Sequence, residues 1–243
     1  MLSLRQLIKR VPGLGFLCHY LHSKYAMSTV KGKSADVIFT EIFHGNKFGG
    51  TQSASGPGSD IYQTRVVRNA LPAVIDDCDI RTMLDIPCGD FHWMKHVSLE
   101  SVDYIGADIV EDLIQQNKKC ETSNVHFCQL NLIEDLLPRV DLVFSRDCFV
   151  HLSFRDTALA LHNICQSGSI YLLTTTFTSC HSNRDIATGQ WRPLNLQNAP
   201  FHFPPPLRVI NEGCTENDGR YSDKSLGLWK VADIEKCLGR RSN

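Results

Sequence analysis

The chain of 243 residues is long enough to bury one well-packed domain and too short for two ordinary domains with a linker. Its 25 Lys and Arg residues nearly balance its 26 Asp and Glu residues, so no positive field attracts nucleic acid and we expect no nucleic-acid partner. No run of 18 apolar residues occurs, which predicts that no segment spans a membrane.

The ten cysteines are scattered along the chain, and none stands in a C-x-x-C pair. Because several fall inside predicted strands and helices, we expect reduced, mostly buried thiols in a cytoplasmic protein. Two groups offer candidate metal ligands, Cys180 with His181 and Cys18 with His19 and His22. Neither has a second ligand pair at zinc-finger spacing, so the sequence predicts no metal site.

Residues 2–27 carry four basic residues and no acidic one. Apolar residues lie between them, but Pro12 and Gly13 interrupt what would be the core of a signal peptide. We therefore expect an N-terminal helical extension over residues 1–36, followed by one globular domain over residues 37–243. Peripheral contact with a membrane surface through residues 2–27 is the alternative.

Residues 39–60 mix aromatic side chains with a stretch rich in glycine and serine. A flexible linker seldom contains aromatic residues, so this pattern favours an ordered lid. Ser59 or Asp60 is expected to cap a following helix of about 15 residues. The predicted apolar face of that helix comprises Ile61, Val66, Val67, Ala70 and Leu71.

Strand-like and helix-like segments alternate from residue 82 onward. The predicted strands cover about 82–86, 103–108, 125–130, 140–145, 169–176 and 225–231, and the predicted helices about 93–97, 110–117, 154–166 and 232–238. Such alternation forms parallel βαβ units, so we expect an α/β fold with an open, mostly parallel sheet and helices on both faces. The stretch 178–207 is aromatic and lacks periodicity, which is typical of a functional loop.

The segment 82–93 reads as a buried strand, a tight glycine turn and a helix start. An open α/β sheet binds nucleotide-like ligands at such a turn. Asp108 follows 19 residues after Gly89, at the end of the second predicted strand. Its carboxylate can accept two hydrogen bonds from a ribose diol, so we expect the ligand to carry a ribose.

The composition of the turn narrows the choice of nucleotide. A dinucleotide fold requires G-x-G-x-x-G, whereas Phe91, His92 and Trp93 crowd the helix start here. No Lys-Ser or Lys-Thr pair follows a glycine loop in this region, so the Walker pattern is absent as well. One glycine flanked by Asp85 and Asp90 suits a ligand with a positive end and no phosphate, which describes S-adenosyl-L-methionine.

The D-x-P-C-G-D-F turn that begins at Asp85 resembles motif I of the class I, or Rossmann-like, S-adenosylmethionine-dependent methyltransferases. With the R-D-x-x-V-H-L-S run that begins at Arg146, it is similar to a group of small bacterial methyltransferases of largely unassigned substrate. This resemblance covers about residues 37–232. It implies a Rossmann-like sheet, S-adenosyl-L-methionine as the cofactor and methyl transfer as the reaction.

The resemblance also implies where the cofactor lies. The glycine turn would lie against the methionine part with an acid facing the ammonium group, and Asp108 would bind both ribose hydroxyls. Asn131 stands where many relatives have an acid that reads the adenine amino group, and its side-chain oxygen can still accept that bond. The implied cofactor-binding residues are Asp85, Cys88, Gly89, Asp90, Asp108, Ile109, Asn131, Leu132, Ser145 and Arg146.

Asp147 and His151 are the predicted catalytic residues. They are four residues apart, so on a helical turn they share one face, and a histidine held by a carboxylate can act as a general base. The alternative is that His151 only caps the following helix. The chain lacks the N-P-P-Y run of many N-methyltransferases, so we expect O-methylation of a small-molecule or glycan hydroxyl, in a pocket roofed by residues 39–60 and 178–207.

Two other functions remain open at this stage. A catalytically silent cofactor-binding subunit would keep the same motif. A nicotinamide-dependent oxidoreductase is less favoured, because the turn has a single glycine.

Overall fold

The computed structural model describes residues 32–239. The predicted N-terminal helical extension, its membrane contact and the Cys18-His19 group lie outside the described residues. From Ala35 onward the chain forms one compact unit. No helix within the described range is long and apolar enough to cross a membrane.

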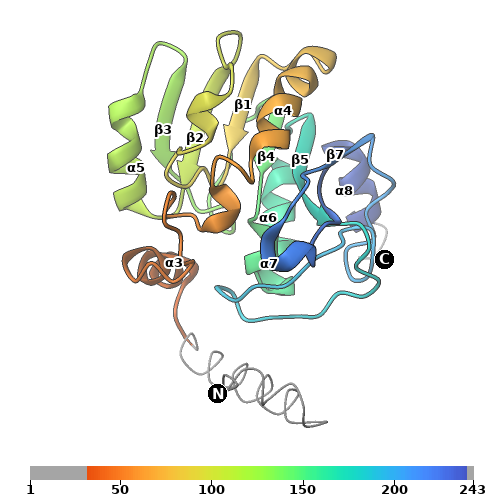
Figure 1. Ribbon diagram of the computed structural model, residues 1–243. Helices are drawn as coiled ribbons and strands as arrows, with labels where there is room; N and C mark the ends of the chain where they lie inside the picture. Colours follow the sequence, from red (N-terminus) through yellow and green to blue (C-terminus); the bar gives the residue numbers. More distant parts are fainter. Residues whose placement is uncertain (1–31, 240–243) are drawn as a thin grey trace, which may run out of the picture. The chain divides into compact units, whose positions relative to one another are not determined.

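A single seven-stranded sheet runs through this unit, in the order β3-β2-β1-β4-β5-β7-β6 (Figure 1). The strands are β1 (Thr82–Asp85), β2 (Asp103–Asp108), β3 (Val125–Gln129), β4 (Leu142–Ser145), β5 (Tyr171–Phe177), β6 (Arg208–Asn211) and β7 (Lys224–Lys230). The first five strands are parallel, and β7 pairs antiparallel with both β5 and β6. The expected open, mostly parallel, Rossmann-like sheet is confirmed.

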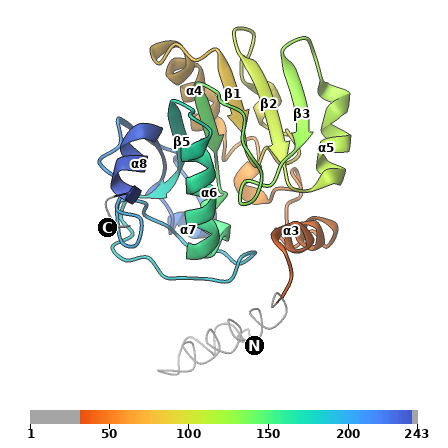
Figure 2. The same ribbon diagram turned by 180° about the vertical axis from the view of Figure 1, so that it is seen from behind.

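Helices cover both faces of the sheet, as Figures 1 and 2 show from opposite sides. The α-helices are α3 (Ala35–His44), α4 (Arg65–Asp77), α5 (Glu111–Asn117), α6 (Phe154–Gln166), α7 (Glu216–Gly219) and α8 (Val231–Gly239). Four single 3-10 turns lie between the helices and strands of the described residues: η1 (Pro57–Ser59), η2 (Met94–His96), η3 (Lys118–Cys120) and η4 (Phe149–His151).

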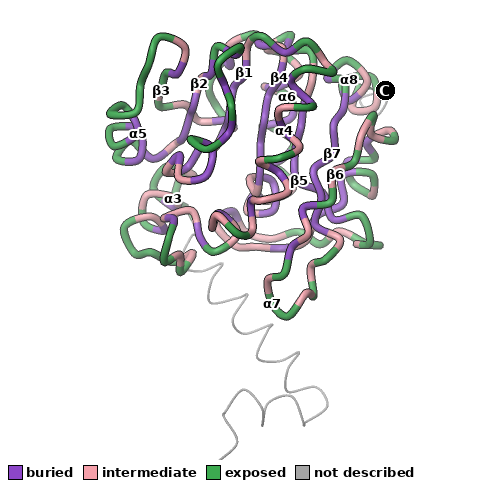
Figure 3. The backbone as a smooth tube through the Cα atoms, turned by 45° about the horizontal axis from the view of Figure 1, so that its top comes forward, coloured by how far each residue is buried: buried purple, intermediate pink, exposed green. Residues whose placement is uncertain are grey.

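Two apolar clusters sandwich the sheet, because alternate residues of each strand point to opposite faces. Met83 belongs to the cluster that packs on α4, and Leu84 to the cluster that packs on α6 and α8. The buried parts of the tube in Figure 3 follow the strands. Both faces of the central strands are therefore apolar, which is why these strands read as continuous hydrophobic runs in the sequence.

Local sequence signals account for some elements and not for others. Ser153 caps α6 by accepting a hydrogen bond from the backbone N–H of Asp156 at 3.1 Å, and α6 has the bounds expected from its periodicity. The helix predicted over 93–97 is only the turn η2, because Phe91 has left-handed backbone (φ 54°) and is buried in the core. The strand β6 was not predicted.

The order of the strands creates a switch point between β1 and β4. From β1 the chain continues to β2 and β3 on one side of the sheet, then crosses to β4 and β5 on the other side. A crevice opens at the carboxyl ends of the two strands where such a reversal occurs, and ligands of open α/β sheets bind there.

Candidate functional site

A cavity opens at the carboxyl ends of β1, β2 and β4, with an empty volume of about 1120 Å³ including its open mouth. We refer to it as the central cavity. Every residue that the sequence assigned to the cofactor or to catalysis lines it, with the exception of Ser145. The lid adds Phe39, Phe43, Phe48, Ala54, Ser55 and Ser59 to its wall.

Ser145 was predicted to bind the cofactor, but it does not line the central cavity. It is fully buried inside β4, where its carbonyl accepts a hydrogen bond from Oγ1 of Thr174 at 2.6 Å. Its neighbours Phe144 and Arg146 line the central cavity. Successive side chains of a strand alternate between faces, so the side chain of Ser145 points away from the cavity.

Gly89 forms the tight turn after β1, with left-handed backbone (φ 57°). A Cβ added there would stand 2.1 Å from Oγ of Ser55 in the lid, so no other residue fits without a rearrangement. The backbone N–H of Gly89 donates to Oδ2 of Asp108 at 3.1 Å, and its carbonyl accepts from the amide of Asn117 at 2.7 Å. The glycine is thus required both by its backbone conformation and by the close approach of the lid.

Asp108 ends β2 with a buried carboxylate at the wall of the cavity. Its Oδ1 accepts from the N–H of Val110 at 3.0 Å, and its Oδ2 accepts from Gly89. The backbone N–H of Ile109 is a further hydrogen-bond donor to this carboxylate. A carboxylate has about four acceptor positions, so at least one stays open for another donor. Burial raises the pKa of Asp108 to about 6, and the group is mostly ionised at neutral pH.

Asp85 ends β1 and is also buried at the cavity wall. The hydroxyl of Tyr104 donates to its Oδ2 at 2.6 Å. Burial raises the pKa of Asp85 to about 8, an effect that the Tyr104 bond only partly offsets. The carboxyl therefore holds its proton at pH 7 unless a positive group comes close.

Asp90 joins the glycine turn to the lid. Its two oxygens accept from Oγ of Ser53 at 2.9 Å and from the N–H of Ala54 at 2.8 Å. Asp90 lines the cavity as predicted, but it holds the lid in place with the same oxygens. The lid expected over residues 39–60 is ordered and lies against the turn at Ser53, Ala54 and Ser55.

Cys88, Ile109, Asn131 and Leu132 complete the wall on the side of β2 and β3. The side-chain oxygen of Asn131 accepts from the N–H of Ile133 at 2.9 Å, so the side chain also stabilises the turn after β3. The amide oxygen keeps a second lone pair for a ligand. Burial raises the pKa of the Cys88 thiol well above its ordinary value, and this cysteine contributes an un-ionised surface.

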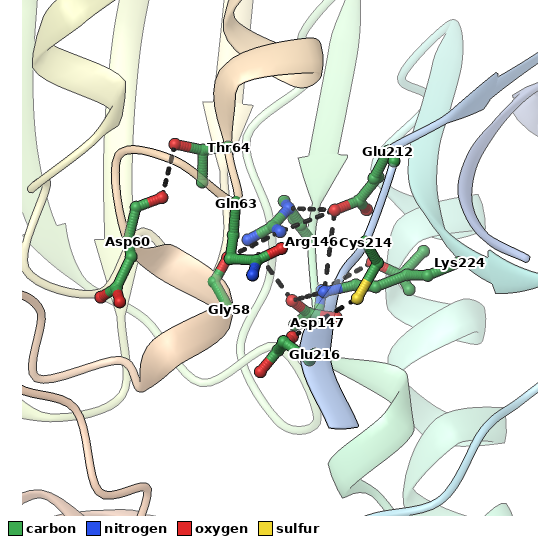
Figure 4. A network of polar contacts seen from close by, with 12 residues as sticks. Gly58, Asp60, Gln63, Thr64, Arg146, Asp147, Glu212, Cys214, Glu216 and Lys224 are labelled. Carbon is green, nitrogen blue, oxygen red and sulfur yellow. Dashed lines mark hydrogen bonds and ion pairs between the residues drawn. The ribbon is translucent and has the colours of Figure 1, made fainter. Parts of the chain in front are cut away.

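Arg146 belongs to a buried network of charges that the sequence did not predict (Figure 4). Its Nε and Nη2 donate to Oε2 of Glu212 at 3.1 and 2.6 Å, and Nη2 also donates to the carbonyl of Gly58 at 2.9 Å. Burial alone would lower the pKa of Arg146, but Glu212 and Asp147 raise it above its ordinary value. The guanidinium therefore stays charged and fixes Gly58 beside β4.

Asp147 is the second anion of this network. Lys224 donates to its Oδ2 at 2.6 Å, and Nη1 of Arg146 lies 3.3 Å from the same oxygen. Burial would raise the pKa of Asp147, but the two cations lower it to about 2. Lys224 is also 3.7 Å from Glu212, so two cations and two carboxylates balance each other.

His151 was expected to be held by Asp147, and the structure corrects this expectation. Its Nδ1 lies 2.9 Å from the carbonyl of Gln190, and its ring packs against Phe48 with the centroids 4.8 Å apart. Among the hydrogen bonds of the described residues none joins His151 to Asp147. Asp147 has left-handed backbone (φ 55°) and precedes the turn η4, so the two residues do not share the face of one helical turn.

The protonation state of His151 follows from these contacts. Burial lowers its pKa below the ordinary value, although the charge of Asp147 partly offsets this effect. The ring is therefore neutral at pH 7. When Nδ1 donates its proton to the carbonyl of Gln190, the lone pair is on Nε2.

A second hollow, which we name the side cavity, adjoins the central cavity and has an empty volume of about 870 Å³ including its mouth. The two cavities share four residues of their walls, Phe48, Ser55, Asp147 and His151. The side cavity is otherwise lined by Lys47, Gly56, Pro57, Gly58, Phe177, Trp191, Cys214, Glu216, Asn217, Tyr221 and Lys224. Of the stretch 178–207 that was expected to roof the acceptor, Trp191 lines this hollow.

Four charged residues of this region were not found by sequence reasoning: Lys47, Glu212, Glu216 and Lys224. The one available signal was Lys224, a charged residue directly before the apolar strand predicted over 225–231. Within residues 32–239, no three His, Cys, Asp or Glu side chains are grouped so that they could hold a metal ion.

No family model matches the sequence, and no curated protein matches it. Among solved structures, the methyltransferase domain of bacterial CtHen1-C superposes with a TM-score of 0.50 at 13% sequence identity, over 70% of this chain and 98% of that domain. The chain has the fold of this methyltransferase domain.

Two more distant structures are similar as well. Magnesium protoporphyrin IX methyltransferase from Synechocystis PCC 6803, with bound SAM, gives a TM-score of 0.47 at 12% identity, over 64% of this chain and 82% of that chain. The sugar N-methyltransferase KedS8 from Streptoalloteichus sp ATCC 53650 gives a TM-score of 0.40 at 18% identity, over 49% of this chain and 50% of that chain.

Proposed function

We propose that the protein is an S-adenosylmethionine-dependent methyltransferase that methylates a hydroxyl oxygen of a small-molecule or glycan acceptor. The observation that carries this proposal is the junction of two cavities at Asp147 and His151. A cofactor and an acceptor must meet at such a junction for a group to pass between them, since alignment supplies most of the rate of a transfer reaction.

The central cavity suits the cofactor by the chemistry of its wall. Asp108 offers at least one open acceptor position on its carboxylate to the hydroxyls of a ribose. Asp85 offers a buried carboxyl to the ammonium group of the methionine part. Gly89, the one glycine of the turn, has left-handed backbone and lets the chain pass close to a ligand in the cavity. S-adenosylmethionine would supply a methyl group bonded to a positively charged sulfur.

His151 is the group that receives the acceptor proton in this proposal. Its Nε2 is unprotonated at neutral pH, since Nδ1 is turned to the carbonyl of Gln190. When the acceptor oxygen takes the methyl group that the cofactor would supply, the hydroxyl proton would pass to Nε2 of His151. Asp147 stays ionised because of Lys224 and Arg146, and its charge stabilises the imidazolium.

Calorimetric titration of the full chain with S-adenosylhomocysteine and, separately, with NAD⁺ tests the cofactor. We expect S-adenosylhomocysteine to bind in the micromolar range and NAD⁺ not to bind. Tighter binding of NAD⁺ would refute the proposal in favour of an oxidoreductase. Formation of S-adenosylhomocysteine from S-adenosylmethionine with a hydroxyl acceptor then tests the reaction, and cofactor binding without turnover for any acceptor would identify a catalytically silent subunit.

A further inference from the structure

The side cavity contains a small polar niche beside Gly58. A Cβ added to Gly58 would stand 3.1 Å from Oε2 of Glu216, 3.5 Å from Nζ of Lys224 and 3.6 Å from Oδ2 of Asp147. Three charged atoms thus surround one point that the absence of a side chain leaves open. Gly58 does not have left-handed backbone, so the chain could adopt this conformation with another residue. What the glycine provides is the space.

The charges around the niche select for a neutral group with donors and acceptors. Lys224 is a donor, whereas Asp147 and Glu216 are acceptors. An acid in the niche would be repelled by the two carboxylates and would have no proton to donate to them. A protonated amine would be attracted by these carboxylates, but it would be repelled by Lys224 and would have no acceptor for the protons of Lys224. A hydroxyl both donates and accepts, and it satisfies both kinds of neighbour at once.

The segment that presents Glu216 is fixed before any ligand binds. The side chain of Gln63 donates to Oγ1 of Thr215 at 2.8 Å and accepts from the N–H of Thr215 at 3.2 Å. Arg65 donates to the carbonyl of Gly213 at 3.1 Å. Since these bonds hold the residues next to Glu216, a ligand does not have to order the segment on binding.

An aromatic surface forms another part of the wall. The rings of Trp191 and Tyr221 lie with their centroids 4.8 Å apart, and each lies 5.9 Å from the ring of Phe177. All three residues line the side cavity. These rings offer an apolar surface next to a niche that prefers hydroxyl groups. A pyranose ring has apolar and polar groups in the matching places, with C–H groups on its faces and hydroxyls at its edge.

We infer that the side cavity binds a neutral sugar, with one hydroxyl in the Gly58 niche and a ring face on Trp191 and Tyr221. This inference rests on the proposed function, because it names the acceptor class of that site. The hydroxyl that is methylated then lies near His151, which lines the same cavity. Gly58 and Glu216 determine specificity and take no part in the transfer.

Saturation-transfer NMR on the full chain, with and without S-adenosylhomocysteine, tests the inference with three probes that differ mainly in charge: methyl glucoside, glucosamine and glucuronate. We expect the neutral glycoside to bind about tenfold more tightly than glucuronate, which the two carboxylates repel, and at least as tightly as glucosamine, which offers Lys224 no acceptor in the niche. The same series is run with methyl galactoside, methyl mannoside and methyl rhamnoside, because the stereochemistry of the acceptor is not specified by the niche. Stronger binding of glucosamine or glucuronate, or no binding of any neutral glycoside at millimolar concentration, would overturn the inference.

Gly58→Ala fills the niche and should weaken binding of the neutral glycoside about tenfold or more, while the affinity for S-adenosylhomocysteine stays unchanged. The side chain of Glu216 is flexible, so its carboxylate can move by the few tenths of an ångström that the methyl group of the introduced alanine requires. Gly239→Ala is the matched control, since no atom of residues 32–239 lies within 4 Å of a Cβ at that position. Unchanged glycoside binding in Gly58→Ala would refute the niche. If the wild-type chain does not bind S-adenosylhomocysteine, the proposed function is refuted, but that result does not contradict the sugar site.

Discussion

The carboxyl of Asp85 is expected to lose its proton when S-adenosylmethionine or S-adenosylhomocysteine binds. Burial raises its pKa to about 8, so at pH 7 about nine tenths of the molecules carry the proton. An ammonium group in contact with the carboxyl favours the ionised form. Binding at pH 7 should therefore release about one proton.

The affinity should then depend on pH with a predictable slope. If only ionised Asp85 binds the ammonium group, the affinity follows the ionised fraction, which rises roughly ninefold between pH 6 and pH 7 for a pKa of about 8. Asp108 has a pKa of about 6, and it adds a further rise of roughly twofold over the same range. Asp85→Asn should keep only this smaller rise, because the amide accepts from Tyr104 and does not titrate.

Calorimetry with S-adenosylhomocysteine in phosphate and in imidazole buffer, at pH 6 and pH 7, measures both quantities. The difference in apparent enthalpy between the two buffers gives the number of protons released. Equal pH dependence in the wild type and in Asp85→Asn, or no difference between the buffers, would refute the assignment of Asp85 to the ammonium group.

Three other substitutions test the site. Asp108→Ala should weaken cofactor binding by about 10- to 100-fold, since hydrogen bonds to a charged group contribute about 1.5–3 kcal/mol. The control Asp103→Ala, at the exposed start of β2, should leave cofactor affinity unchanged. Equal affinities of the two variants would remove Asp108 from the site. Gly89→Ala should abolish cofactor binding, and calorimetry showing affinity within a few-fold of wild type would make the turn purely structural. His151→Ala should lower turnover by about 10²–10⁴ with intact cofactor affinity. In the wild type, turnover should rise with pH through a transition below 6.5, because burial lowers the pKa of this base; a fully active, folded His151→Ala protein would leave alignment alone as the mechanism.

The parts of the fold that could be predicted are those that local signals determine. The capping serine and the buried stripe of α6 are adjacent in the sequence, so its bounds follow from the pattern. β6 is a four-residue edge strand, and it exists because Arg208–Asn211 pairs with Leu228–Ser225 of β7. No local pattern contains that pairing. The predicted helix at Ser59 or Asp60 begins instead at Arg65, because residues 57–59 form a separate turn.

The candidate site divides in the same way. Gly89 and Asp108 could be found from sequence, because each ends a strand and strand ends meet at one edge of a parallel sheet. The partner of Asp147 could not be found, since Lys224 lies 77 residues away and reaches it across the sheet. The orientation of His151 could not be predicted either, because it depends on the backbone carbonyl of Gln190. Every residue has such a carbonyl, so no sequence motif identifies this partner.

The reversed direction of β7 has a consequence for how the acceptor site could change. Because β7 runs against the parallel strands, its first residue, Lys224, lies at the edge where the other strands end. The hairpin that connects β6 to β7 therefore brings Glu212, Glu216 and Tyr221 to the same edge. This one connection thus supplies several residues of the proposed acceptor site, and it is remote along the sheet from the strands that hold Asp85 and Asp108. Replacing residues 213–223 of this hairpin should redirect the choice of acceptor, and keeping Glu212 preserves its ion pair with Arg146 in the wall of the central cavity.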